Sequence, residues 1–337
     1  MKWALLGASN IASEWLVGAI RAVGDEVIAV VSGNPERASS FAKQHGIAHA
    51  FTEAQAANGA LKSLGLDAVY VSNTNDKHEA AVLLAVQLGC HVLCEKPLAL
   101  DLAAAQRMVE ACRAAGLTMG TNHHLRHNSA HRQMRRVLRE QGLGRLVSAR
   151  VSHSVFLRQK LQGWRVDNAA AGGGVVLDIA VHTADSLGFL LGEYPVEVMA
   201  MTHRSGMGQG VEDTSMSVWR YASGLTVLTH QGYTTPYASN RLELLGDQGS
   251  LEGAGVLNQA PGGSLKWCRA DGDLNLRLDH DNLYERCLRE MHKAIQGEAH
   301  DMATGEAGVQ SLAVALAVLE SACTGRSVAV QYPERAA

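Results

Sequence analysis

The first third of the chain alternates short apolar runs with segments rich in helix-forming residues. The apolar runs are residues 3–6, 26–32, 68–72, 91–95 and 117–121, and the helical segments between them are residues 11–23, 35–45, 77–88 and 102–115. Strands that are apolar on both faces and alternate with helices indicate a parallel sheet covered by helices. With right-handed crossovers, this pattern predicts a doubly wound α/β domain of the Rossmann type over residues 1–122.

The pattern changes after residue 122. Period-2 alternation now dominates, in residues 146–155, 196–204, 214–221, 225–231 and 241–245. Helical periodicity is found in residues 129–141, 175–191, 283–295 and 306–323. Alternating strands are typical of an antiparallel sheet with one covered face. We therefore predict an α+β domain over residues 123–337, with a large, open, mainly antiparallel sheet.

Length, charge and composition narrow the classes of function. The 337 residues are about twice the usual domain length, which favours two domains. A formal net charge of -3 provides no basic excess for nucleic acid or an anionic membrane. The six cysteines lack metal-ligand spacing, so we expect no metal. Without a targeting signal or an apolar stretch long enough to span a bilayer, a cytoplasmic location is expected.

A glycine-containing turn follows the first predicted strand and leads directly into a helix. In a dinucleotide-binding fingerprint, glycine occupies the first, third and sixth positions, with alanine accepted at the sixth. Gly7 and Ala12 match, whereas Ser9 replaces the middle glycine, and Ala8, Asn10 and Ile11 fill the rest. A helix N-terminus at this point offers N–H groups to a pyrophosphate. The alternative is an ordinary tight turn between a strand and a helix.

The end of the second predicted strand bears on the choice of cofactor. NAD-binding domains of this type usually place an acidic residue there to hold the ribose hydroxyls. This chain has Ser32 and Gly33 instead, with Arg37 four residues further on. A serine hydroxyl and a guanidinium can bind the extra phosphate of NADP, which a carboxylate would repel. NADP(H) is therefore favoured, although Glu36 lies nearby and Arg37 is also typical of a solvated helix face.

Polar residues follow two further strands of the predicted parallel sheet. Ligands bind at the carboxyl ends of such strands. Glu95-Lys96-Pro97 follows the fourth strand, so we expect the Lys96 side chain to point into the ligand crevice. Asn73-Thr74-Asn75 follows the third strand, where short polar side chains could bind a ribose or pyrophosphate. The alternatives are a lysine that extends to solvent from a strand end and a plain polar turn.

Two polar residues interrupt an apolar helical segment after Gly172-Gly173-Gly174. Asp178 and His182 are four residues apart, which places them on one face of a helix. A buried acid or histidine needs a partner or a function. His182 is suited to give a proton to a carbonyl that accepts a hydride, with Asp178 orienting it or holding a substrate hydroxyl. The alternative is an Asp–His pair that satisfies itself in the core.

Taken together, these motifs resemble those of the Gfo/Idh/MocA oxidoreductases. The resemblance rests on Glu95-Lys96-Pro97 and on Gly174, Asp178 and His182, and it extends over nearly the whole chain. It implies NADP(H)-dependent reduction of a keto-sugar, with Lys96, Asp178 and His182 as the catalytic group. It also implies that Ala8 to Ile11 wrap the pyrophosphate and that Ser32, Gly33 and Arg37 meet the 2′-phosphate. The rest of the cofactor would be lined by Asn73, Thr74, Asn75, Asp76, Lys77, His78, Glu95, Lys96, Asn122, Trp164, Arg165 and Tyr284.

Two other functions are compatible with the sequence. One is a polyol or inositol dehydrogenase of the same family that works in the oxidative direction, which Ser32 and Arg37 disfavour. The other is a regulator that binds cofactor or sugar without turnover, which has no need of Lys96 and His182. A small sugar is the expected partner in each case, and the chain could be a monomer or a homodimer.

Overall fold

The computed structural model describes residues 1–333, which divide into two compact units. The first unit comprises residues 1–123 and 284–309, and the second comprises residues 124–283 together with the chain from residue 310 on. Residues 284–309 therefore belong to the first unit, whereas the sequence analysis assigned them to the second domain. Their side chains supply part of the first hydrophobic core, which sequence order alone does not reveal.

The first unit contains the predicted parallel sheet. Its six strands lie in the order β3-β2-β1-β4-β5-β6, and every neighbouring pair is parallel. The order reverses between β1 and β4, and open α/β sheets bind ligands at such a switch point. The strands are β1 (Lys2–Leu6), β2 (Glu26–Ser32), β3 (His49–Thr52), β4 (Ala68–Val71), β5 (His91–Cys94) and β6 (Met119–Thr121). The Rossmann prediction is confirmed, with β3 as the one strand that the periodicity missed.

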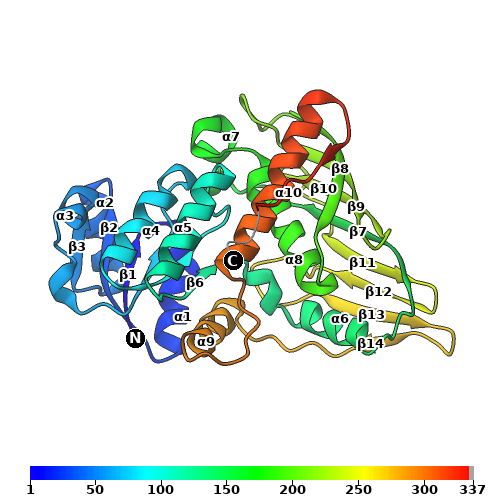
Figure 1. Ribbon diagram of the computed structural model, residues 1–337, viewed down its shortest axis with the longest axis horizontal. Helices are drawn as coiled ribbons and strands as arrows, with labels where there is room; N and C mark the ends of the chain where they lie inside the picture. Colours follow the sequence, from blue (N-terminus) through cyan, green and yellow to red (C-terminus); the bar gives the residue numbers. More distant parts are fainter. Residues whose placement is uncertain (334–337) are drawn as a thin grey trace. The chain divides into compact units, whose positions relative to one another are not determined.

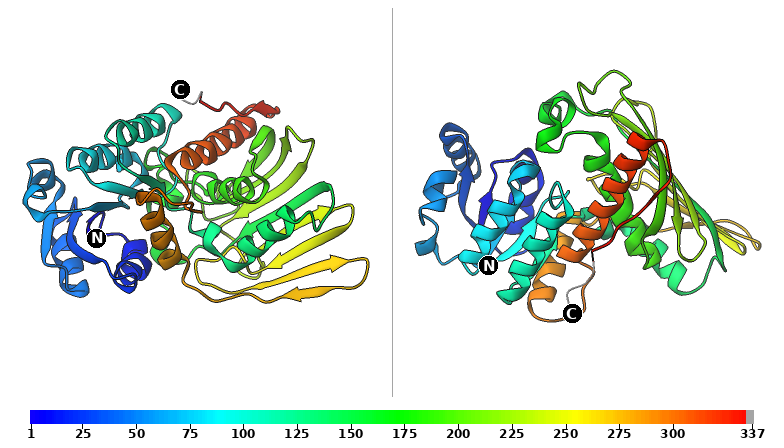
Figure 2. Two further views of the ribbon diagram at one scale, coloured as in Figure 1. Left: turned by 60° about the horizontal axis from the view of Figure 1, so that its bottom comes forward. Right: turned by 45° about the horizontal axis from the view of Figure 1, so that its top comes forward.

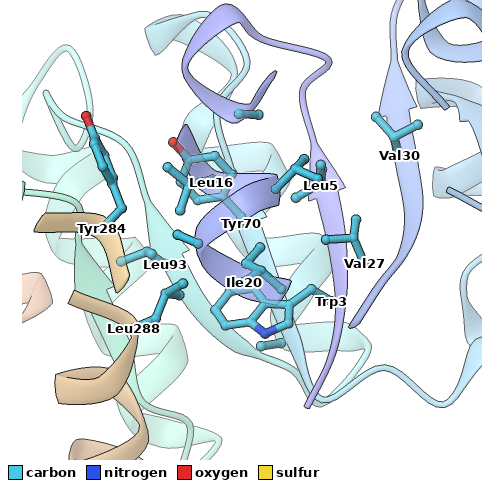
Figure 3. Packing of buried hydrophobic residues seen from close by; sticks show 14 of the residues in the cluster. Trp3, Leu5, Leu16, Ile20, Val27, Val30, Tyr70, Leu93, Tyr284 and Leu288 are labelled. Carbon is cyan, nitrogen blue, oxygen red and sulfur yellow. The ribbon is translucent and has the colours of Figure 1, made fainter. Parts of the chain in front are cut away.

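Helices cover both faces of this sheet (Figure 1). They are α1 (Val17–Ala22), which follows a π-helical turn (Ala12–Leu16), α2 (Pro35–His45), α3 (Glu53–Ala57), α4 (His78–Gln87), α5 (Leu102–Ala114) and α9 (Leu283–Ile295). Figure 3 shows Trp3, Ile20 and Tyr70 in the core, where Leu288 joins them from α9. These four side chains are fully buried, so α9 is an integral part of the first unit.

The second unit contains a nine-stranded sheet in the order β14-β13-β12-β11-β7-β10-β9-β8-β15. The β7 and β10 strands are parallel and the other neighbouring pairs are antiparallel, which confirms the predicted mainly antiparallel sheet. The strands are β7 (Leu146–Ser154), β8 (Pro195–His203), β9 (Thr214–Tyr221), β10 (Thr226–Gly232), β11 (Arg241–Gly246), β12 (Gly249–Ala254), β13 (Ser264–Arg269), β14 (Leu274–Leu276) and β15 (Val328–Ala329).

One face of this sheet is covered and the other is open. Along β9, Trp219 and Tyr221 are buried whereas Met216 and Val218 are exposed, as period-2 alternation requires. The helices α6 (Ser129–Arg139) and α8 (Val181–Leu191) pack against each other on the covered side, and Figure 2 shows both beside the strands of the second unit. The chain enters α8 through a π-helical turn, Val176–Ala180.

Two helical stretches contradict the expectation that no apolar segment is long enough to span a bilayer. Ala169–Leu191 and Gly305–Thr324, the latter being α10, have mean hydropathies of 1.5 and 1.4 over membrane-spanning lengths. Both are largely buried among other residues of the chain, and a core helix of a soluble protein passes the same test. The sequence predicts helices over residues 175–191 and 306–323, but isolated polar residues such as Asp178 and Ser311 interrupt their apolar runs and hide the length of the apolar segments.

Candidate active site

The turn after β1 has the geometry of a phosphate-binding loop. Gly7 has a φ of +134°, and a Cβ atom there would lie 2.5 Å from the Ser72 carbonyl carbon, so only glycine fits. The Ser9 hydroxyl contacts the Ser72 hydroxyl at 2.8 Å and accepts the Ala12 N–H at 3.1 Å. Ser9 therefore caps the helix at the position where the fingerprint has its middle glycine.

The remaining fingerprint residues lie within or directly after this turn. Ala8 is buried, whereas Asn10 and Ile11 form the start of the helix that Ser9 caps. A helix N-terminus beside a tight glycine turn suits an anionic pyrophosphate, because its first N–H groups and its dipole both favour negative charge.

The structure brings Arg37 to the same turn. Its Nε donates to the Ala8 carbonyl at 2.7 Å, although the two residues are 29 positions apart in sequence. Ser32, at the end of β2, accepts the Asn34 N–H at 3.3 Å, and Asn34 in turn caps α2. Ser32, Gly33 and Arg37 thus adjoin the phosphate-binding turn, which fits a ribose that carries a 2′-phosphate.

A cavity of about 410 Å³ opens beside this turn. Its lining includes the apolar residues Leu6, Val31, Ala57, Ala81 and Leu84 and the predicted cofactor residues Gly7, Asn73 and Lys77. Thr74 precedes a short 3-10 turn formed by Asn75, Asp76 and Lys77. Apolar walls with a few polar groups at one end suit an adenosine moiety, so the residues present fit a dinucleotide.

His78 connects two loops of the first unit. The ring is fully buried, its Nδ1 lies 3.0 Å from the Pro97 carbonyl oxygen, and its Nε2 lies 3.3 Å from the Asn73 carbonyl oxygen. Burial lowers the pKa of His78, which favours the neutral imidazole. His78 therefore positions the two loops that carry Asn73 and Pro97, and its contact with the cofactor stays a prediction.

The segment after β5 carries a network around Glu95. The Asn122 amide donates to Glu95 Oε1 at 2.6 Å, and the Tyr70 hydroxyl donates to the same oxygen. Burial and the neighbouring Glu95 carboxylate raise the pKa of Tyr70, so the phenol keeps its proton. Lys96 follows directly, and its peptide bond to Pro97 is cis. Glu95 is thus fixed from two sides beside the predicted catalytic lysine.

Tyr284 enters the first unit from α9. It is fully buried, and its ring stacks on Trp15 with centroids 5.3 Å apart. Tyr284 carries its hydroxyl away from the core residue Leu288 in Figure 3. A stacked, buried ring has a structural function of its own, and a contact with the cofactor stays a prediction.

In the second unit, Asp178 is held by two side chains. The Tyr233 hydroxyl donates to Asp178 Oδ2 at 2.8 Å, and Arg165 Nε lies 3.8 Å from the same oxygen. Arg165 also stacks over the Trp164 ring, with its guanidinium carbon 4.6 Å from the ring centroid. Both residues belong to α7 (Trp164–Asp167), so the predicted residues Trp164, Arg165 and Asp178 form one cluster.

The glycines before Asp178 allow the backbone to pack closely against its neighbours. A Cβ atom on Gly173 would lie 2.5 Å from the Trp164 carbonyl oxygen and 2.8 Å from that of Asn168. The backbone of residue 173 therefore packs directly against α7 and the turn after it. This contact places the Trp164–Arg165 pair beside the π-helical turn that carries Asp178.

His182 lies among other buried histidines that the sequence analysis did not assign to catalysis. Its ring centroid is 5.0 Å from that of His124 and 6.3 Å from that of His153, and its own exposed fraction is 7%. From the sequence alone, His124 is compatible with either a substrate contact or a structural role. His153 lies on β7, and the alternation of that strand predicts only that its side chain is on the covered face. Its proximity to His182 is therefore visible only in the fold.

The predicted site residues thus form two groups. The second unit holds Trp164, Arg165, Asp178 and His182. The first unit holds the predicted cofactor residues, which are Gly7 to Ala12, Ser32, Gly33, Arg37, residues 73–78, Glu95, Lys96, Asn122 and Tyr284. Tyr233, His124 and His153 are additional members of the second group. That the two groups act on one ligand stays a prediction.

Known proteins match the chain over nearly its full length. Residues 1–123 match a model described as an oxidoreductase family with an NAD-binding Rossmann fold, and residues 131–252 match the GFO/IDH/MocA C-terminal domain. The 1,5-anhydro-D-fructose reductase of Ensifer adhaerens is 46% identical, with 98% of each chain covered. The D-xylose 1-dehydrogenase (NADP(+)) 2 of Haloferax volcanii is 28% identical, covering 97% of this chain and 99% of that one.

Among solved structures, the aldose-aldose oxidoreductase of Caulobacter crescentus in complex with glycerol is similar throughout. Its TM-score is 0.87 at 25% identity, with 98% of this chain and 99% of that chain covered. Family models that together span both units, and a relative at 46% identity over the full length, are decisive. The chain belongs to the GFO/IDH/MocA oxidoreductase family.

Proposed function

We propose that this protein uses NADP(H) to reduce the carbonyl of a keto-sugar, with 1,5-anhydro-D-fructose as substrate and 1,5-anhydro-D-mannitol as product. The observation that carries the proposal is the 46% identity to a 1,5-anhydro-D-fructose reductase, which extends over 98% of both chains. The absence of an acid at the end of β2, with Ser32 there and Arg37 beside the turn, supports NADP(H) over NAD(H).

The residues of the site have distinct tasks in this proposal. The chemistry that bound NADP(H) supplies is hydride transfer at its nicotinamide ring. His182 gives a proton to the carbonyl oxygen as negative charge develops there, and Lys96 stabilises that charge. Asp178, held by Tyr233 and Arg165, accepts a hydrogen bond from a sugar hydroxyl and so fixes the orientation of the carbonyl.

The alternative is a sugar or polyol dehydrogenase working in the oxidative direction, as the similarity to a D-xylose 1-dehydrogenase suggests. We expect a cytoplasmic enzyme in either case, as a monomer or a homodimer. The open face of the nine-stranded sheet exposes Met199, Met201 and Leu228, which favours the dimer.

The test is a panel of keto-sugars, including 1,5-anhydro-D-fructose, mixed with the protein and NADPH. Consumption of NADPH, followed by the absorbance of the reduced nicotinamide, is the expected result, with 1,5-anhydro-D-mannitol identified by chromatography. NADP reduction with xylose or an inositol, and no turnover of the keto-sugars, would favour the oxidative alternative. Cofactor binding without turnover of any sugar would point to a regulator.

A further inference from the structure

An ion pair lies at the cavity beside the phosphate-binding turn. Lys77 Nζ is 2.9 Å from both carboxylate oxygens of Glu53, and both side chains line the cavity. Each side chain is 44% exposed, so the pair is partly hydrated and remains open to a ligand. From the sequence, Lys77 is linked to the cofactor only through the family resemblance, and no local motif marks Glu53.

The fold fixes Glu53 at the ligand-binding edge of the sheet. Glu53 directly follows β3 and is the first residue of α3. A capping box holds that helix start: the Gln55 N–H donates to the Thr52 hydroxyl at 3.2 Å, and the Thr52 N–H donates to the Gln55 side chain at 2.8 Å. The backbone that carries the carboxylate is therefore anchored independently of Lys77.

The Glu53 carboxylate lies against Gly33, which follows Ser32 at the end of β2. A Cβ atom on Gly33 would be 3.3 Å from one carboxylate oxygen and 3.5 Å from the other. The end of β2 is where domains of this type meet the adenosine ribose. The chain has no acidic residue at the end of β2, but the Glu53 carboxylate, which follows β3, places a negative charge beside that strand end.

An acid in this place should oppose the inferred choice of NADP(H). A lone carboxylate accepts a hydrogen bond from a ribose 2′-hydroxyl and repels a 2′-phosphate. Lys77 removes that conflict, because its ammonium group neutralises the carboxylate through two short contacts.

We propose that the Glu53–Lys77 pair sets the preference between NADP(H) and NAD(H), in addition to Ser32 and Arg37. Lys77 allows the 2′-phosphate to bind by neutralising Glu53, and Glu53 alone favours the 2′-hydroxyl. The inference rests on the proposed function, since it requires that the first unit bind a dinucleotide at this turn. It adds a determinant from the start of α3 and the 3-10 turn before α4 to a selectivity otherwise attributed to β2 and α2.

The test is a double-mutant cycle on the full-length protein, with Lys77→Met, Glu53→Gln and the double variant. Dissociation constants for NADPH and NADH are measured separately from the fluorescence of the reduced nicotinamide, without any sugar. Lys77→Met is expected to shift the ratio of the two constants toward NADH by about tenfold, because it leaves the partly exposed Glu53 carboxylate without its neutralising partner. In the Glu53→Gln background the same change is expected to shift the ratio by less than about threefold.

Glu79→Gln provides the matched control. Glu79 forms a similar exposed ion pair, with Arg107 Nε 2.6 Å from its carboxylate, but it does not line the cavity. Its substitution is expected to leave the ratio of dissociation constants unchanged. Raising the salt concentration should reduce the shift in Lys77→Met, because the pair is exposed to solvent.

Several outcomes would overturn the inference. If Lys77→Met weakened the binding of NADPH and NADH equally, the ion pair would have only a structural role. Thermal unfolding of each variant identifies a loss of fold. An equally large shift in the Glu53→Gln background would show that Lys77 acts without Glu53. If the unaltered protein bound neither cofactor, the proposed function would fail as well, which distinguishes that failure from a failure of the pair alone.

Discussion

The two groups of candidate site residues, one in each unit, are built in different ways. In the first unit the proposed cofactor side consists of strand-end loops. Its proposed binding groups are the backbone at Gly7 and exposed charges such as Arg37. In the second unit the substrate side consists of buried side chains: His182 is 7% exposed, and Asp178 receives a hydrogen bond from the fully buried Tyr233. The first half is therefore tuned by surface charge, whereas the second depends on burial and packing.

This difference predicts how each half responds to substitution. A changed charge on the cofactor side should alter which cofactor binds and leave the fold intact, because water compensates at exposed positions. A changed side chain on the substrate side should alter turnover, and often stability too, because buried polar groups lose partners that nothing replaces.

The largest effect is expected at the reacting carbonyl. His182→Ala should lower kcat with the keto-sugar by about a thousandfold, since general acid catalysis contributes on the order of 10²–10⁴. The dissociation constant for NADPH should stay within about twofold, because His182 belongs to the other unit. Stopped-flow turnover and nicotinamide fluorescence measure the two quantities.

The control for His182 is His203→Ala, which removes an exposed imidazole at the end of β8. Lys96→Ala should also lower kcat by orders of magnitude, from the cofactor side of the site. Near-normal turnover in either His182→Ala or Lys96→Ala would remove that residue from the mechanism.

A charge on the cofactor side should change selectivity without changing the fold. Ser32→Asp restores the acid that NAD-binding domains carry and should shift the NADPH-to-NADH preference by about a hundredfold, because like charges in contact cost several kcal/mol. Ser40→Asp adds the same charge at an exposed position of α2 and should leave the NADPH-to-NADH preference nearly unchanged. Equal affinities in Ser32→Asp and the unaltered protein would discredit the assignment of the phosphate site.

Acid should destabilise the second unit through His131 on α6. The ring is fully buried and neither nitrogen has a hydrogen-bond partner among the described residues. Burial lowers its pKa to about 4, so between pH 6.5 and 4 the unfolded chain binds the proton more readily and stability falls as pH falls. At pH 5 the loss is about 2 kcal/mol relative to pH 7.

His131→Leu tests this assignment, because it fills a similar volume without a titratable group. Urea unfolding at pH 7 and pH 5 should show a smaller difference between the two pH values in the variant, by about 2 kcal/mol. An unchanged pH dependence would mean that other groups cause the acid sensitivity.

The same contrast explains how much the sequence could predict. The cofactor side was accessible because its residues follow consecutive strands, and the carboxyl ends of parallel strands meet at one edge. Ser9, Ser32 and Lys96 could therefore be placed from local motifs alone. The strand β3 was missed because it is only four residues long and none of the four is buried, so its apolar pattern is weak.

The substrate side could be predicted only in part. Asp178 and His182 were recognised because polar residues in an apolar helix are conspicuous in one sequence. Their neighbours could not be placed beside them, because His124, His153 and Tyr233 come from elements up to 58 positions away from His182, and no local motif marks that proximity. The Glu53 carboxylate beside Gly33 was invisible for the same reason, since strand order brings it there.

The smallest effect is expected at Tyr233, which acts through another residue. Burial and the Asp178 carboxylate raise the pKa of Tyr233, so its hydroxyl stays protonated and donates to Asp178 at 2.8 Å. A hydrogen bond to a charged group contributes about 1.5–3 kcal/mol, and Arg165 still holds Asp178 in the Tyr233→Phe variant. We therefore expect kcat to fall by about tenfold with unchanged NADPH affinity.

Tyr221→Phe is the control for Tyr233→Phe. It removes a buried hydroxyl that has no hydrogen-bond partner in the described part of the chain, so it should leave kcat unchanged. If the two variants behaved alike, Asp178 would keep its position without Tyr233, and the substrate side would be less dependent on buried partners than its packing suggests.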